Sequence, residues 1–141
     1  MNLRYVQATE SDIPVIFAQA KELIDHYEDL SCIDYDKVLK WVNNKITHEI
    51  TTYRCVLLDG KPAAYYRLCR DGELDDLYVL PRYRNRGIGS EIMKKCLEES
   101  EKPLYLYVFT LNKRAISFYE RFDFSVRETV GTTRLIMARS G

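Results

Sequence analysis

Apolar residues recur along the chain with two different periods, which predict strands in some segments and amphipathic helices in others. Four segments have the period of a helix with one buried face: 14–27, 35–46, 88–99 and 113–121. Seven shorter segments predict strands: 3–7, 52–58, 62–70, 73–79, 104–108, 125–130 and 133–138. Asp-Gly pairs at 59–60 and 71–72 predict tight hairpin turns between the central strands.

This order of elements predicts one α/β (α+β) domain over residues 1–141. Its centre would be a mixed, largely antiparallel twisted sheet of about six or seven strands, with about four helices on its faces. The composition agrees, because 46% hydrophobic and 30% charged residues are typical of a globular protein. A chain of 141 residues is also long enough to bury well over half of its unfolded surface.

The balance of charge excludes several classes of function. The formal net charge is zero, so nothing draws the chain to nucleic acid or to anionic membranes. The sequence has neither an apolar run of about eighteen residues nor a basic and apolar leader, so a cytoplasmic protein with no membrane partner is expected. The cysteines (Cys32, Cys55, Cys69 and Cys96) have neither metal nor redox spacing. They are expected to be reduced and mostly buried, with no metal bound.

The turn at 81–90 carries the clearest candidate chemistry. It joins an apolar strand to a helix and holds three arginines and two glycines. Glycines let backbone N–H groups approach a ligand closely, and the start of a helix adds a partial positive charge. Together with Arg82, Arg84 and Arg86, these amides form a candidate site for a diphosphate.

Other phosphate-binding turns fit this segment poorly. A dinucleotide-binding fold would need a third glycine where Ile92 stands, and an acidic residue at the end of the next strand, where the chain reads Tyr-Val-Phe-Thr at 107–110. A P-loop would need Gly-Lys-Ser/Thr, which the sequence lacks. For the turn taken alone, an ordinary loop with a solvated basic face stays open.

A second motif follows the predicted strand at 104–108. Asn112, Ala115 and Tyr119 are spaced along the next predicted helix, which leads into Phe-Asp-Phe at 122–124. Ala115 and Tyr119 fall on the same helix face. For an isolated pattern, the favoured interpretation of Tyr119 is a core aromatic with its hydroxyl at the rim. The upstream turn shifts the balance toward a functional role.

Taken together, the two motifs resemble those of the GNAT superfamily of N-acetyltransferases. The match consists of Arg-x-x-Gly-x-Gly at 84–89, directly after a Leu-Tyr-Val strand end, and of Asn-x-x-Ala-x-x-x-Tyr at 112–119. The opening Arg-x-x-x-Ala-Thr-x-x-Asp at 4–12 is also usual in the family, so the resemblance covers nearly the whole chain. The family usually has glycine where Asp123 stands, and aspartate tolerates the same left-handed backbone.

The resemblance implies a GNAT-type acyl-CoA N-acyltransferase fold, with acetyl-CoA as the co-substrate. It assigns to Tyr119 the role of the acid that protonates the leaving sulfur, which a neutral phenol can fill at pH 7. The residues that it places along the coenzyme are Leu77, Tyr78, Val79, Arg84, Asn85, Arg86, Gly87, Ile88, Gly89, Ser90, Asn112, Ala115 and Tyr119. A homodimer through the last strands is compatible with the resemblance, although nothing in the sequence demands it.

Three carboxylates on the strand 73–79 are candidates for the base that accepts a proton from the amine. Glu73 and Asp75 share one face by alternation, and Asp76 points to the other face unless a bulge intervenes. Residues 75–79 resemble the Glu-Asp-Phe-Phe-Val stretch of the spermidine/spermine N-acetyltransferase branch, where the first acidic residue is the base. Asp75, acting through a water, is therefore expected to be the base, with Asp76 next and Glu73 third.

The connection at 25–36 is the expected side of acceptor binding. It holds five carboxylates and neither Lys nor Arg, and such a rim attracts a cation. His26 and Tyr27 are expected to contact the acceptor, together with Asp75 and Asp76. Acidic residues next to helix ends also occur without any ligand, so a solvated helix end stays open.

The expected function is transfer of acetyl to the primary amine of a small cationic acceptor, such as a polyamine, an amino acid analogue or an amino sugar. Two alternatives are open. One is acetylation of a protein N-terminus or lysine, and the other is a domain that senses acetyl-CoA without catalysis. The intact Tyr119 and the acidic strand argue against the sensor.

Overall fold

The structure is a computed structural model that describes residues 1–139, with seven strands and four α-helices in that range. The strands are β1 (Leu3–Gln7), β2 (Arg54–Leu58), β3 (Lys61–Leu68), β4 (Leu74–Val79), β5 (Tyr105–Phe109), β6 (Phe124–Val130) and β7 (Arg134–Arg139). The helices are α1 (Ile13–Tyr27), α2 (Tyr35–Glu49), α3 (Ile88–Glu99) and α4 (Lys113–Glu120). Every predicted element is present, and the largest difference is at α2, which continues beyond residue 46 to Glu49.

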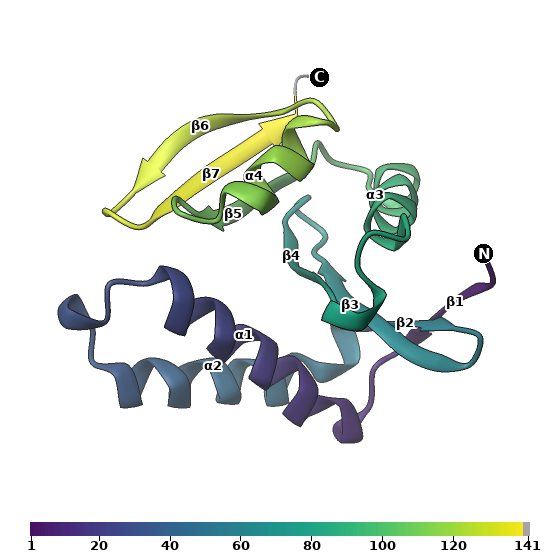
Figure 1. Cartoon of the computed structure of the whole chain (residues 1–141), viewed down its shortest axis with the longest axis horizontal. Coiled ribbons are helices and arrows are strands. Elements are labelled where there is room, and N and C mark those ends of the chain that lie inside the picture. Colours follow the sequence, from purple (N-terminus) through teal and green to yellow (C-terminus); the bar gives the residue numbers. More distant parts are fainter. Residues whose placement is uncertain (140–141) are drawn as a thin grey trace.

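The strands form two antiparallel sheets, where the sequence predicted one continuous sheet. The first has the order β1-β2-β3-β4 and the second the order β5-β7-β6. They meet at a single parallel bridge between Glu73 and Tyr105, where the Tyr105 amide donates to the Gly72 carbonyl at 3.1 Å. Beyond this bridge β4 and β5 are edge strands of separate sheets, and Figure 1 shows the sheets diverging.

Gly72 allows the two sheets to approach at the bridge. Its φ is +99°, and a Cβ at this position would lie 2.3 Å from the backbone oxygen of Pro103. Only glycine fits such a contact at a positive φ. The Asp71-Gly72 turn therefore does more than connect β3 to β4, because it also joins the two sheets.

Helices cover the first sheet on both faces. α1 and α2 lie side by side on one face (Figure 1), where Ile16 and Ile46 pack against Tyr65 of β3. The next residue of β3, Tyr66, belongs to the other core, which is shared with α3, α4 and the second sheet. This alternation along a strand that is buried on both faces explains why β3 reads as a continuous apolar run.

None of the helices within residues 1–139 combines the length and the apolar character needed to cross a membrane. All four cysteines are unpaired, but only Cys55 and Cys96 are buried. Cys69 is half-buried and Cys32 is exposed, so the prediction of mostly buried thiols holds for two of the four.

Candidate active site

A β-bulge in β4 shapes the centre of the candidate site, as the sequence allowed. The pairing of β3 with β4 shifts register between Tyr65 and Arg67, and Asp76 has a φ of +59°. An extra residue in one strand redirects its side chains and increases the local twist. The Asp76 carboxylate consequently accepts a hydrogen bond from the Tyr53 hydroxyl at 3.1 Å.

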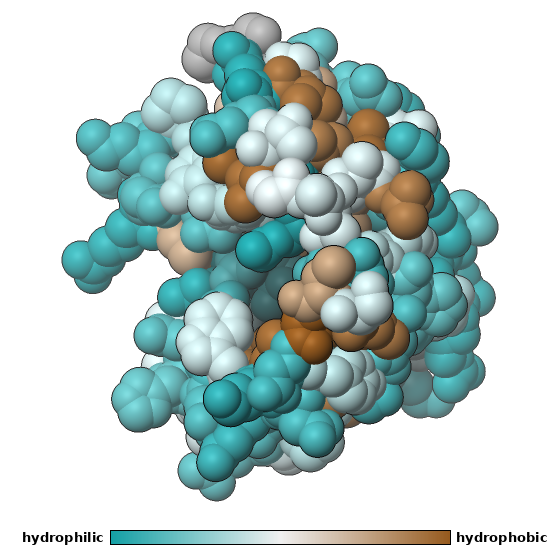
Figure 2. Space-filling view, turned by 90° about the vertical axis from the view of Figure 1, so that its left-hand side faces the viewer, coloured by the Kyte–Doolittle hydropathy of each residue, from teal (hydrophilic) through white to brown (hydrophobic). Residues whose placement is uncertain are grey.

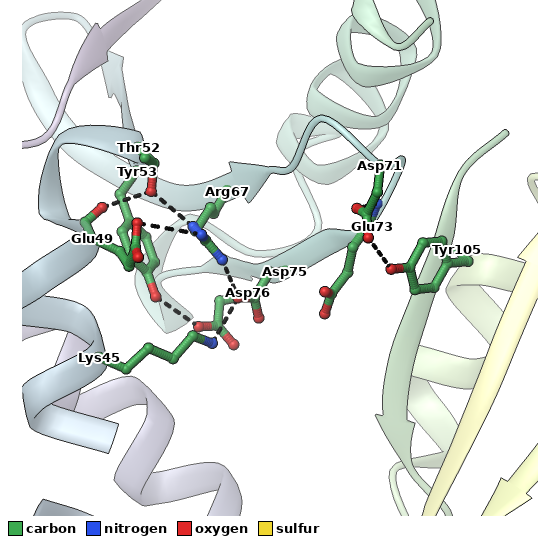
Figure 3. Close-up of polar contacts among 10 residues, drawn as sticks. All are labelled: Lys45, Glu49, Thr52, Tyr53, Arg67, Asp71, Glu73, Asp75, Asp76 and Tyr105. Atoms are coloured by element: carbon green, nitrogen blue, oxygen red, sulfur yellow. Dashed lines mark hydrogen bonds and ion pairs between the residues drawn. The ribbon is translucent and has the colours of Figure 1, made fainter. Parts of the chain in front are cut away.

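Asp75 lies between two cations. Its Oδ2 accepts from Lys45 Nζ at 2.7 Å and from Arg67 Nη1 at 3.0 Å, and its side chain is 12% exposed. Arg67 is its partner across the strands, whereas Lys45 reaches it from α2. Figure 3 shows these side chains converging on β4. Both cations contact the same carboxylate oxygen, so the Asp75 side chain is fixed in place by two elements of the fold.

Arg67 is itself fixed by two further contacts. Its Nε donates to Thr52 Oγ1 at 2.7 Å, and its Nη2 lies 3.5 Å from Glu49 Oε2. The cations Lys45 and Arg67 thus balance the carboxylates of Asp75 and Glu49. This local neutrality leaves the other two carboxylates of the strand as its uncompensated charges.

Asp76 is the less constrained of the two aspartates. Its side chain is exposed to solvent, although many protein atoms lie around the carboxylate. This burial and the adjacent Asp75 charge raise the pKa of Asp76, and Lys45 acts in the opposite direction. The pKa of Glu73 is also raised, by burial and then by Asp75. Both carboxylates are therefore better proton acceptors than an ordinary exposed one.

The free edge of β4 offers main-chain groups to a ligand. Leu80 donates its amide to Ala63 of β3 at 2.9 Å, so by ladder alternation the amide and carbonyl of Val79 point away from β3. Arg84 Nε donates to this Val79 carbonyl at 3.1 Å. An extended chain laid along this edge would pair with it as an additional strand.

The 84–90 loop leaves the first amides of α3 available. Asn85 and Gly87 have φ values of 63° and 83°, and α3 begins at Ile88 without a side-chain cap. Amides of this kind at a helix start bind anions. Gly89 has a separate role, because a Cβ there would lie 3.3 Å from the Phe118 ring of α4.

The three arginines of this turn rest on tyrosine rings. Arg82 and Arg86 lie over Tyr83 at 5.4 and 5.6 Å from its centroid, and Arg84 lies over Tyr78 at 5.2 Å. The Tyr78 hydroxyl in turn donates to Glu22 of α1 at 3.2 Å. These contacts hold the cations next to the free helix amides.

Tyr119 lies on the other side of the diverging strands. Its ring is buried against Phe118 and Phe124, with centroids 5.3 and 5.7 Å away. Burial raises the pKa of Tyr119, and the charge of Asp76 adds to this effect. The phenol is therefore neutral at physiological pH and within electrostatic range of Asp76. α4 is capped by Asn112, whose Oδ1 accepts from the Ala115 amide at 3.2 Å.

The acidic connection at 25–36 is explained largely by local structure. Asp25 accepts from Lys21 Nζ at 2.9 Å and from the Tyr35 hydroxyl at 2.6 Å. Asp29 accepts from Ser31, and Asp34 caps α2 through the Lys37 amide. Of the five carboxylates on this rim, four therefore have partners within the protein, and Glu28 is the fourth.

The end of α1 contacts the second sheet. Tyr27 stacks on Phe109 of β5 with ring centroids 6.1 Å apart, and Glu28 accepts from Thr133 in the β6–β7 turn. His26 is exposed and contacts the Glu22 carbonyl of its own helix at 3.0 Å. On this side of the molecule, Figure 2 shows a recess between the two halves, with hydrophilic residues in its depth.

Sequence reasoning missed Lys45, Tyr53 and Arg67. Arg67 had a usable signal, since it is a lone cation after the apolar run 63–66 in a central strand. Lys45 and Tyr53 had none, because they reach the site only through tertiary packing. The fold also brings Cys69, Asp71 and Glu73 within 4.8 Å of one another, although their spacing matches no metal motif.

Comparison with known proteins identifies the family. The model of the acetyltransferase (GNAT) family matches residues 18–124, which is most of the chain. The chain is 36% identical over 69 residues to an uncharacterized N-acetyltransferase of Methanocaldococcus jannaschii, covering 45% of this chain and 30% of that protein. It is 45% identical over 51 residues to a thialysine N-epsilon-acetyltransferase of Bos taurus, covering 33% and 30%. The chain spans less than half the length of the curated relatives it matches.

Solved structures agree in fold over the whole chain. The Apo-form YjaB of Escherichia coli superimposes with a TM-score of 0.72 at 17% identity, covering 100% of this chain and 99% of that one. The PaiA N-acetyltransferase of Thermoplasma acidophilum, solved in complex with coenzyme A, gives 0.70 at 20% identity with both chains fully covered. With the family match, these likenesses confirm the predicted fold class: the protein belongs to the acetyltransferase (GNAT) family.

Proposed function

We propose that the protein transfers acetyl from acetyl-CoA to the primary amine of a small acceptor. One observation carries this proposal. The unpaired edge of β4 runs from the free amides of α3 to a site where a reachable carboxylate, Asp76, lies within electrostatic range of a buried phenol, Tyr119.

In this proposal the diphosphate of the coenzyme binds the 84–90 loop through the amides of Gly87 to Ser90, with Arg84 and Arg86 adding charge. The pantetheine arm lies along β4, where the outward-facing amide of Val79 is available and the Val79 carbonyl also accepts from Arg84 Nε. Leu77 and Tyr78 flank that position. Asn112 and Ala115 contribute by holding the start of α4, which carries Tyr119.

The reaction needs few protein groups, because a thioester is already activated and correct placement supplies most of the rate. The nitrogen lone pair attacks the carbonyl carbon, and the C–S bond breaks as the C–N bond forms. Tyr119 protonates the departing sulfur, and a water passes the proton of the ammonium to the base.

Asp76 is the base that we favour, ahead of Glu73 and Asp75. Asp76 is reached by solvent and has a raised pKa, which suits proton uptake. Asp75, the first choice from the sequence, is bound by both Lys45 and Arg67. We therefore assign Asp75 to the positioning of these cations.

The acceptor is an amine that reaches Asp76 from the side of His26 and Tyr27. The similar bovine protein is a thialysine N-epsilon-acetyltransferase, so its acceptor is an amino acid analogue. By extension, an amino acid analogue joins a polyamine and an amino sugar as candidates for this chain.

Release of free thiol from acetyl-CoA tests the function. Purified protein is mixed with acetyl-CoA and a panel of polyamines, amino acids, aminoglycosides and short peptides, and the thiol is measured for each. We expect release with at least one small amine. Tight coenzyme binding without release from any member would support a sensor instead, and release with peptides alone would support a protein acetyltransferase.

A further inference from the structure

Lys45 reaches into the candidate site from α2. Its Nζ lies 2.7 Å from Asp75 Oδ2 and 6.0 Å from the centroid of the exposed Trp41 ring one turn earlier. Burial acts to lower the pKa of Lys45, but the charges of Asp76 and Asp75 outweigh it and the pKa is raised. The protein therefore keeps a permanent ammonium of its own beside the proposed base.

The charges around Lys45 limit the number of positive charges that an acceptor can carry into the site. Lys45 and Arg67 neutralise Asp75 and Glu49, as Figure 3 shows. Among the described residues, Glu73 and Asp76 of the same strand have no cation within salt-bridge distance. These two can receive the reacting amine. Once Asp76 is occupied by that amine, the carboxylate that contacts Lys45 is Asp75, which Lys45 and Arg67 already share.

The rim carboxylates are not partners of Lys45. Asp25 is paired with Lys21 and Asp34 with Lys37, and Glu28 and Asp29 accept hydrogen bonds from neutral donors. A second positive charge on an acceptor would approach the Lys45 ammonium, and like charges placed together in a partly desolvated site repel strongly. The same ammonium would attract a carboxylate and could donate a hydrogen bond to a hydroxyl oxygen.

We propose that Lys45 is a specificity-determining residue, which selects amines with a neutral or anionic remainder, such as amino alcohols and amino acids, over polyamines. This inference rests on the proposed acetyltransferase function and narrows its acceptor class. In this inference Lys45 acts by repelling acceptors that carry a second positive charge. Binding sites often discriminate through such a repulsive contact with the wrong ligand.

Two amines of equal chain length separate charge from size. Cadaverine carries an ammonium at each end, and 5-aminopentan-1-ol replaces one of them with a hydroxyl. Acetyl transfer to each is measured as kcat/KM per amine in the wild type, Lys45→Met and Lys45→Arg. We expect the wild type and Lys45→Arg to prefer the amino alcohol, and Lys45→Met to shift the ratio toward cadaverine by on the order of tenfold.

Lys21→Met is the matched control, because it also removes a lysine paired with an aspartate, at 2.9 Å on α1. It should leave the ratio unchanged. A second measurement needs no variant: in the wild type, added salt should weaken the preference for the amino alcohol by screening the repulsion. This keeps the inference testable if Lys45→Met does not fold.

A wild type that already prefers cadaverine would overturn the inference, as would a folded Lys45→Met with the wild-type ratio. In both cases thiol release shows that the acetyltransferase proposal survives. Absence of release from every amine would contradict the acetyltransferase proposal and this inference with it.

Discussion

Two adjacent residues in one strand have opposite surroundings at the centre of this site. Asp75 is held by Lys45 and Arg67, whereas Asp76 has one neutral partner and reaches solvent. The bulge at Asp76 breaks the alternation that would otherwise place the two side chains on opposite faces, and the difference between them comes from the partners that the fold supplies to each. The partners of the two aspartates depend on the backbone geometry, so the sequence alone could not show which of them is the better candidate for the base.

Replacing Tyr119 with phenylalanine should lower kcat by about 100-fold, because the leaving thiolate loses its proton donor. The dissociation constant of coenzyme A, measured by calorimetry, should stay close to that of the wild type. Tyr5→Phe on β1 removes a comparable hydroxyl away from the site and serves as the control. Equal loss of coenzyme affinity and turnover would assign Tyr119 to binding.

The pH dependence of kcat/KM should identify the base. A base acts only when deprotonated, so a raised pKa of Asp76 moves the loss of activity on acidification to a higher pH than an ordinary aspartate would. Asp75→Asn removes a negative charge that raises the pKa of Asp76. In this variant the acidic limb of the kcat/KM profile should therefore shift to lower pH. The amine of the acceptor contributes equally to both profiles. An identical limb in the two proteins would contradict Asp76 as the base.

At the scale of elements, the segment from β4 to α3 acts as one unit. The strand edge exposes main-chain groups, the turn carries cations on tyrosine rings, and the helix start exposes amides. Each part is weak alone, but their order along the chain matches the order of arm and diphosphate in the coenzyme. This explains why the sequence identified the segment so readily.

The double substitution Arg84→Ala with Arg86→Ala should weaken coenzyme A binding by about tenfold or more, since charge-assisted contacts to phosphate are lost. The difference from the wild type should shrink as salt is added. Pantetheine, which lacks the diphosphate, should lose far less affinity in the same calorimetric titration. Arg127→Ala, which removes an exposed arginine of β6, is the control for loss of a surface cation elsewhere. Unchanged coenzyme affinity in the double variant would refute the loop as the diphosphate site.

At the scale of the whole molecule, the site exists because two sheets meet at one bridge and then diverge. Glu73 and Tyr105 mark the bridge, and the carboxylates and Tyr119 lie on either side of the opening. The end of α1 contacts the second sheet through Tyr27 and Glu28. The geometry of the opening therefore depends on both the bridge and α1.

Gly72→Ala should destabilise the protein by roughly 3 kcal/mol, combining left-handed strain with the clash against Pro103. Gly60→Ala is the matched control, because Gly60 also follows an aspartate in a turn with positive φ but has no atom near its missing Cβ. It should cost only about 1 kcal/mol. Urea unfolding of both variants measures the difference, and equal losses would show that the bridge tolerates a side chain.

The sequence by itself determined the elements and the family and indicated the proposed coenzyme segment, because these depend on local periodicity and on contiguous motifs. The left-handed backbone of Asp123, with a φ of 68°, agrees with the family motif, whereas the bulge at Asp76 had been left open. Tertiary structure alone decided the partners of each carboxylate. Lys45 lies 30 positions before Asp75, and no local period links them. Contacts between residues so far apart in the sequence are set by packing, which is why the sequence did not reveal the role of Lys45.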